Sequence, residues 1–216
     1  MKTTDFLRIG VFYDGTHFIK AQNYFWVQSG KKDWLSFHEF HKFLEKYISI
    51  KEQEHSRYKV VYSAWFQGLH KDTEANEANL RKDRKLHIDL LHAGIELKNF
   101  LMSESTGKEK GIDVYMAIET LQVGLDDKMD VAVLVTGDGD FVPLARALMK
   151  NGIRVLIAYF KYVEPDHKSY ANERLINSAN YSININELET DRDFKADFKT
   201  MFRHKDDSKK EKLTQS

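Results

Sequence analysis

Four aspartates stand where carboxylates could act together on a metal ion or a phosphate. Asp14 follows one apolar run, and Asp138 and Asp140 follow another, residues 131–135. Asp113 opens a helical pattern between them. Converging carboxylates repel one another unless they are protonated or bind a cation, and oxygen ligands favour Mg²⁺ or Mn²⁺. Such a metal can neutralise charge on a phosphoryl group and activate a water, which is the chemistry of phosphodiester hydrolysis.

Most of these aspartates also have an ordinary structural explanation. Asp14 with the glycine after it has the composition of a common turn. Asp113 would be stabilised by the helix dipole in the first turn of its helix. Asp140 could cap the helix that follows it, whereas Asp138 has no comparable local role. The pair Asp138 and Asp140 is therefore the more specific part of the pattern.

Strand and helix patterns alternate along the chain and predict an α/β fold. Continuous apolar runs are typical of strands buried on both faces of a parallel sheet. Strands joined through helices form right-handed crossovers, and ligands bind at the carboxyl ends of the strands where the strand order reverses. We expect Asp14 and Asp138 to be neighbours at such a point. The predicted strands are residues 7–13, 58–66, 95–98, 131–135 and 153–160, with 182–185 as a short addition.

Three helices have patterns specific enough to define a start or a face. Ser36 and Glu39 have the spacing of a capping box, which marks a helix start. The apolar face of that helix is predicted to consist of Phe37, Phe40, Leu44, Tyr47 and Ile48. The helix that Asp113 opens is predicted to carry an apolar face of Val114, Ala117, Ile118 and Leu121. A further helix is predicted over residues 141–150.

Composition limits the class of protein. A chain of 216 residues suits one well-packed domain with a tail. Lys plus Arg and Asp plus Glu both total 33, so a nucleic-acid surface would have to be local. The absence of cysteine excludes disulfides, thiolate catalysis and cysteine zinc sites, and a cytoplasmic location is the simplest fit. The sequence has no leader pattern and no apolar run of membrane length, so we expect no membrane association.

The end of the chain differs in character from the rest. We predict a domain over residues 1–190, followed over residues 191–216 by a charged C-terminal helix and a disordered tail. An aromatic stripe keeps helical spacing in this segment and consists of Phe194, Phe198, Met201 and Phe202. The stripe either docks on the domain or binds a partner, which would be a second copy of the chain or another protein.

Three motifs follow one another along the chain. They are Val-Phe-Tyr-Asp-Gly at residues 11–15, Lys-Gly-Ile-Asp-Val at 110–114 and Val-Thr-Gly-Asp-Gly-Asp-Phe-Val-Pro-Leu at 135–144. Together they resemble the NYN-domain family, in particular its LabA-like branch, within the PIN-like nuclease superfamily. The resemblance covers about residues 7–185. It implies a PIN-like three-layer α/β sandwich, in which helices flank a mainly parallel five-stranded sheet of order 3-2-1-4-5.

The resemblance also implies a metal-dependent ribonuclease that acts on RNA, with single-stranded RNA as the expected substrate. Its implied catalytic and metal-binding residues, for Mg²⁺ or Mn²⁺, are Asp14, Asp113, Asp138 and Asp140. The candidate substrate-binding residues are His17, Thr136, Lys108 and Lys110. The two lysines precede Asp113 and could contact the phosphate backbone. Further basic groups that could do so are Lys98 and the cluster Arg81, Lys82, Arg84 and Lys85, for which a solvated helix face is the alternative.

One position departs from the family pattern. NYN sequences usually carry Asn three residues after the first aspartate, where this chain has His17. Histidine titrates near neutral pH and asparagine does not. The replacement therefore either makes activity depend on pH, abolishes it, or is only a structural substitute.

Two other functions stay open at this point. A non-catalytic RNA-binding or regulatory module would keep the fold without the reaction. A haloacid-dehalogenase-like phosphatase is suggested by Asp14 and the glycine-spaced aspartates, but that chemistry needs a second acid two residues after the nucleophile. Thr16 occupies that position.

Overall fold

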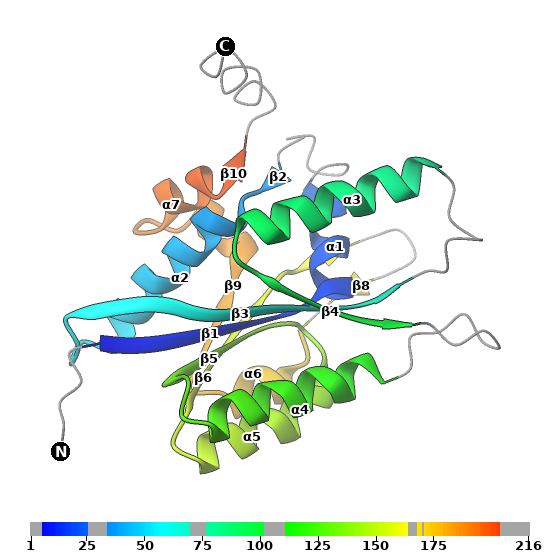
Figure 1. Ribbon diagram of the computed structural model, residues 1–216. Helices are drawn as coiled ribbons and strands as arrows, with labels where there is room; N and C mark the ends of the chain where they lie inside the picture. Colours follow the sequence, from blue (N-terminus) through cyan, green and yellow to red (C-terminus); the bar gives the residue numbers. More distant parts are fainter. Residues whose placement is uncertain are drawn as a thin grey trace.

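A six-stranded, fully parallel sheet forms the centre of the protein (Figure 1). The computed structural model describes residues 6–25, 34–69, 77–101, 111–163, 168–169 and 171–203. The strands of the sheet are β1 (Phe6–Asp14), β3 (Arg57–Leu69), β4 (Glu96–Leu101), β5 (Val131–Val135), β6 (Arg154–Tyr159) and β9 (Tyr181–Asn184). Their order is β4-β3-β1-β5-β6-β9. This confirms the predicted order 3-2-1-4-5, and β9 adds a sixth strand because it pairs with β6.

Helices cover both faces of the sheet and give the expected three layers (Figure 1). On one face lie α1 (Gly15–Asn23), α2 (Phe37–Lys51), α3 (Glu77–His92) and α7 (Lys195–Thr200). On the other lie α4 (Ile112–Leu125), α5 (Val142–Lys150) and α6 (Glu173–Ser178). The remaining elements are the 3₁₀ turns η2 (Gly139–Phe141) and η3 (Ile185–Glu189) and the short strand pairs β2 (Trp34–Leu35) with β10 (Phe202–Arg203) and β7 (Tyr162–Val163) with β8 (Lys168–Ser169). Within the described ranges, none of these helices combines the length and the apolar character that crossing a membrane requires.

The strand β5 shows why its sequence has no polar alternation. All five of its residues are fully buried. Val131, Val133 and Val135 belong to the core under α1 and α2, whereas Ala132 and Leu134 belong to the core under α4 and α5. A strand with helices on both faces needs apolar side chains at every position.

Helices α2 and α4 differ in how well the sequence predicts their buried face. The predicted face of α2 is confirmed, since each of its five residues is at most 8% exposed. In α4, Val114 and Ile118 are each 61% exposed, so the predicted face is wrong for these two residues. The residues that α4 buries include Ile112, Met116 and Val123. Apolar residues lie on nearly all sides of α4, and periodicity alone does not select the side that packs.

The aromatic stripe near the C-terminus docks on the domain. Phe198, Met201 and Phe202 are buried, and the Phe202 ring centroid lies 5.0 Å from that of Phe25. The helix is shorter than its pattern indicated because it ends at Thr200, after which β10 pairs antiparallel with β2. The domain boundary at residue 190 stays a prediction, and the predicted disordered tail lies outside the described residues.

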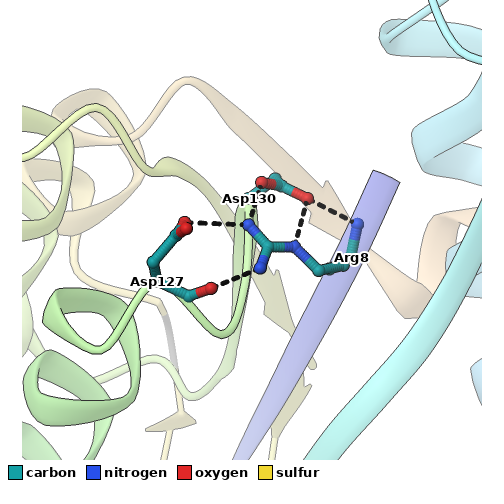
Figure 2. A network of polar contacts seen from close by, with 3 residues as sticks. All are labelled: Arg8, Asp127 and Asp130. Atoms are coloured by element: carbon teal, nitrogen blue, oxygen red, sulfur yellow. Dashed lines mark hydrogen bonds and ion pairs between the residues drawn. The ribbon is translucent and has the colours of Figure 1, made fainter. Parts of the chain in front are cut away.

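Arg8 joins the amino ends of β1 and β5 (Figure 2). Its guanidinium donates to Asp130 from Nε at 3.0 Å and from Nη2 at 2.7 Å, and Nη2 also donates to Oδ1 of Asp127 at 2.9 Å. The Arg8 backbone N–H donates to Asp130 as well, at 2.7 Å. Burial alone would raise the pKa of Asp130, but the hydrogen bonds and charge of Arg8 lower it. We call Arg8, Asp127 and Asp130 the amino-end network.

Candidate active site

Asp14 is held at the carboxyl end of β1 by two neutral donors. Its Oδ1 accepts the backbone N–H of His17 at 3.0 Å, so Asp14 caps helix α1. Its Oδ2 accepts the hydroxyl of Thr136 at 2.9 Å. Thr136 reaches Asp14 because β1 pairs with β5, whose last residue precedes Thr136. The parallel pairing therefore brings the first and third sequence motifs together, as predicted.

Thr136 links Asp14 to the second acidic segment. Its side chain is fully buried, and its Oγ1 accepts the backbone N–H of Asp138 at 3.2 Å while donating to Asp14. One hydroxyl thus sets the positions of two candidate catalytic residues. In this structure Thr136 acts as a positioning residue, and its direct contact with substrate stays a prediction.

Asp138 and Asp140 lie in the turn between β5 and α5, and both are exposed. Asp138 Oδ1 accepts the backbone N–H of Asp140 at 2.9 Å and so caps η2. The expectation that Asp140 caps the following helix is wrong, and Asp138 has the local role that the sequence did not indicate. The reason is that the turn η2 precedes α5, whose N-cap residue is Phe141.

This turn packs directly against the start of α6. The backbone N–H of Asn172 donates to the carbonyl of Gly137 at 2.9 Å. A Cβ on Gly139 would lie only 2.4 Å from Nδ2 of Asn172, so no side chain fits at position 139 without displacing Asn172. The glycines around Asp138 therefore allow α6 to come close to the acidic residues.

Asp113 lies in the first turn of α4, in the helical layer on the opposite face of the sheet from α1. Gly111 is the N-cap residue of α4 and has a φ of 91°, a backbone conformation that glycine adopts readily. Asp113 is exposed, and its charge acts on Asp14. The second sequence motif thus reaches the same edge of the sheet as the other two.

The carboxylate of Asp14 lies in an unfavourable electrostatic environment. Burial, the largest cause, raises its pKa to about 6, and the negative charges of Asp113 and Asp138 add to the increase. The hydrogen bonds from His17 and Thr136 offset only part of it. Among the described residues, no basic side chain forms an ion pair with Asp14. Three of the four predicted aspartates are thus close enough to interact, a repulsion that a bound cation would relieve.

Oxygen donors of this kind fit a hard divalent cation. Within the part of the chain that the structure describes, however, no three His, Cys, Asp or Glu side chains are close enough to hold an ion together. Asp140 is not among the charges that shift the pKa of Asp14. Mg²⁺ usually keeps several waters and binds proteins through one or two carboxylates, so two of these aspartates satisfy its ordinary requirement.

His17 lies beside the turn of residues 136–141 that carries Asp138 and Asp140, which we call the acidic turn, and it is only 7% exposed. The backbone N–H of Phe160 donates to its Nε2 at 3.4 Å, and a Cβ on Gly137 would lie 3.2 Å from its Cε1. Burial lowers the pKa of His17 to about 4, so the imidazole is neutral near pH 7. The geometry favours a structural substitute among the three expectations for this residue, and its contact with substrate stays a prediction.

The basic residues predicted to contact RNA lie in different surroundings, and some of them lie outside the described residues. Lys108, Lys110 and the side chain of Lys82 lie outside the described residues. Lys98 is 16% exposed and pairs with Glu96 at 2.8 Å and with Glu119 at 3.1 Å, so its charge is neutralised within the protein. Lys85 lies over the ring of Trp34, with 5.5 Å between Nζ and the ring centroid, on the face opposite α4.

Sequence reasoning missed three residues beside the acidic turn. Asn172 packs on Gly139, while Arg146 on α5 and Arg174 on α6 line an open groove that also includes Asp140. Asn172 carries a local signal, because Asn before a short helical pattern is a typical N-cap, and it does cap α6. Neither arginine has a spacing that relates it to the aspartates.

Comparisons with known proteins agree with this architecture. No curated protein matches the chain. A crystal structure of a protein of unknown function from Vibrio parahaemolyticus superposes with a TM-score of 0.56 at 20% identity, covering 90% of this chain and 99% of that one. At this identity the similarity concerns the fold alone. The NYN domain model matches residues 8–186, most of the chain, and the protein therefore belongs to the NYN domain family of the PIN-like nuclease superfamily.

Proposed function

We propose that this protein is a metal-dependent ribonuclease that hydrolyses phosphodiester bonds in single-stranded RNA. The family assignment supports a nuclease. The observation that carries the proposal is the environment of Asp14, whose pKa is raised to about 6 by burial and by Asp113 and Asp138. A buried carboxyl group with a strongly shifted pKa, close to other aspartates at the carboxyl edge of a parallel sheet, is typical of catalytic sites.

In this proposal, one set of residues would hold a cation, and a second set positions the side chains that hold it. Mg²⁺ or Mn²⁺ would be held by Asp14, Asp113, Asp138 and Asp140. When bound, the cation neutralises charge on the scissile phosphoryl group and lowers the pKa of a water. Thr136 and the backbone N–H of His17 orient the two oxygens of Asp14. The proposed contacts of Lys108 and Lys110 are with the RNA backbone.

Asp138→Asn tests this assignment. Asparagine keeps the oxygen that caps η2, so the turn is preserved while the charge is lost. We expect Mn²⁺-dependent cleavage of a labelled single-stranded RNA to fall by at least about 100-fold. Asp126→Asn is the matched control, since Asp126 is exposed and its described partners are Lys128 and Gln122, near the end of α4. Cleavage by Asp138→Asn at the control rate would contradict the proposed site.

One observation favours a second candidate, a non-catalytic RNA-binding module. Among the described residues no three possible ligands form a ready metal group. This function is distinguished by RNA binding that is insensitive to Mg²⁺ and Mn²⁺, with no cleavage of any RNA tested.

The finer expectations from the sequence are part of the same proposal. They are membership of the LabA-like branch, a cytoplasmic location, and a second copy or another protein as partner through the C-terminal helix. Any such partner would have to bind beside Phe198 and Met201, because both side chains are already buried against the domain.

A further inference from the structure

An open groove of about 690 Å³ lies between α5 and α6 and begins at the proposed active site. Gly139 and Asp140 belong both to the groove and to the turn that carries Asp138. The other lining residues are Val142, Pro143, Arg146, Arg174, Asn177 and Ser178. The volume is within the range of pockets that take ligands the size of a nucleotide. The groove therefore adjoins the turn that carries Asp138 and Asp140.

Arg146 and Arg174 give the groove its positive charge. They come from different helices, and both are exposed. Among the residues that the structure describes, neither guanidinium forms an ion pair, in contrast to Lys98, which is held between two glutamates. A guanidinium is a planar fork of donors that matches the oxygens of a phosphate. The two arginines are thus available to an anion from outside the protein.

The groove is held in place relative to the acidic turn. Asn172 caps α6 two residues before Arg174, and its side chain packs against Gly139. Its backbone N–H also bonds to the carbonyl of Gly137 at 2.9 Å. The helix that carries Arg174 is therefore fixed to the turn that carries Asp138, so the distance between the acidic and basic groups does not depend on a flexible connection.

We propose that this groove binds the phosphate backbone of the RNA strand next to the scissile bond, with Arg146 and Arg174 each contacting a phosphate. The inference rests on the proposed ribonuclease function and adds a substrate path to it. The chain has no overall positive charge, so RNA affinity has to come from local cationic sites of this kind. Contacts to phosphates carry no base specificity, and the groove would therefore accept RNA of any sequence.

Equilibrium binding of a labelled single-stranded RNA tests the groove directly. The full chain carries Asp138→Asn and is measured in EDTA, so that no cleavage intervenes. Replacing both arginines, Arg146→Gln with Arg174→Gln, should weaken binding by about tenfold or more at low salt. The slope of log affinity against log salt should become shallower by about 0.7 for each lost contact. The charge-matched control is Lys150→Gln with Arg192→Gln, at two exposed positions outside the groove.

Two outcomes of this binding measurement would overturn the proposal. Unchanged affinity in the groove variant would show that the arginines do not meet RNA. Equal weakening in the groove variant and the control would show a long-range effect of net charge without a site. Arg146→Lys with Arg174→Lys should recover part of the affinity, because the charge returns without the guanidinium fork.

Cleavage by the chain with an intact Asp138 separates this proposal from the proposed function. A dinucleotide that occupies only the aspartates should be cleaved equally with and without the arginines, whereas a longer RNA should be cleaved more slowly by the groove variant. If the wild-type chain cleaves no RNA, the ribonuclease proposal fails, and the binding measurement still decides the groove. If it cleaves long RNA at the same rate with and without the arginines, only the groove proposal fails.

Discussion

At the amino ends of β1 and β5, Arg8 donates to Asp130 at 2.7 Å and to Asp127 at 2.9 Å, and the pKa of Asp130 is lowered. At the carboxyl ends of the same two strands, the described partners of Asp14 are an N–H and a hydroxyl, and its pKa is raised to about 6. The strands, their pairing and the residue type are the same at both ends. Within the part of the chain that the structure describes, the ends differ in whether a cationic side chain compensates the carboxylate of Asp130 or of Asp14.

The charged groups at the amino ends stabilise the fold. We infer that the carboxylates at the carboxyl ends serve to bind a ligand. A half-buried carboxylate with an arginine partner ties two strands together. A buried carboxylate such as Asp14, which has no cationic partner among the described residues, costs stability, a cost that proteins accept at functional sites. The amino-end network and the candidate active site are therefore expected to respond in opposite ways to the loss of one charge.

Asp14→Asn should have the largest effect and acts at the carboxyl end. Asparagine keeps an oxygen for the N–H of His17 but removes the repelled charge. We expect RNA cleavage to fall by at least about 100-fold, and the free energy of unfolding in EDTA at neutral pH to rise by about 1 kcal/mol. Cleavage assays and urea unfolding measure the two quantities. A variant that is both inactive and less stable would show that Asp14 supports the fold. This would contradict the difference that we infer between the two ends of β1 and β5.

Arg8→Gln acts at the amino end and should do the reverse. It removes the guanidinium hydrogen bonds to Asp130 and Asp127, keeps the backbone N–H bond to Asp130, and leaves Asp130 half-buried without its cation. We expect the free energy of unfolding to fall by about 2 kcal/mol, while cleavage well below the melting temperature is retained. Arg57→Gln, at an exposed position at the start of β3, is the control. An unchanged melting temperature for Arg8→Gln would remove the contrast between the two ends.

The pH dependence of stability should have opposite signs at the two ends. The pKa of Asp14 is raised from 3.8 to about 6, so its contribution is full below about pH 4 and is lost as pH rises through 6. The pKa of Asp130 is lowered, so its contribution is present above 3.8 and is lost as pH falls through the lowered value. In unfolding measurements without divalent cations, Asp14→Asn should flatten the decline between pH 4 and 6, by about 1.5 kcal/mol.

The same measurement on Asp130→Asn should instead flatten the rise of stability in acid. If both variants altered the same pH range in the same direction, the opposite pKa shifts of Asp14 and Asp130 would be contradicted. Asp193→Asn, at an exposed position outside both groups, serves as the reference variant for this measurement.

Thr136→Val should have the smallest effect and tests positioning without removing a charge. Valine has nearly the same shape but neither donates to Asp14 nor accepts from Asp138. We expect the rate of cleavage to fall by about tenfold and the pH profile to move upward, because Asp14 loses a hydrogen bond that lowers its pKa. Thr136→Ser should restore both. A reduced rate with an unmoved pH profile would mean that the hydroxyl does not act through Asp14.

The sequence predicted those parts of the fold that depend on local pattern. The face of α2 follows from the spacing of Phe37, Phe40 and Leu44, and all three are buried. Val114 and Ile118 on α4 have an equally regular spacing but are exposed. In α4 the tertiary arrangement chooses among several apolar sides, and a single sequence does not contain that choice.

The acidic part of the site was predictable because strand order brings chain-distant motifs together. Asp14 ends β1 and Thr136 follows the adjacent parallel strand β5, so their contact follows from the order of the sheet. The basic part was not predictable in this way. Arg146 and Arg174 line the same groove from two different helices, and this arrangement depends on how the helices pack. Lys98 looked available in the sequence, but its neighbours Glu96 and Glu119 neutralise it.

The contact between Gly139 and Asn172 has a consequence for how this protein can change over evolutionary time. With only 2.4 Å between a Cβ at one position and the amide of the other, the two residues share a single space. A larger residue at position 139 needs the side chain at position 172 to move or shrink, which disturbs the side chain that caps α6. Substitutions at these two positions should therefore be inherited together, and each should be harmful alone. The acidic turn is thus restricted to a narrow set of sequences by its neighbour as well as by its chemistry.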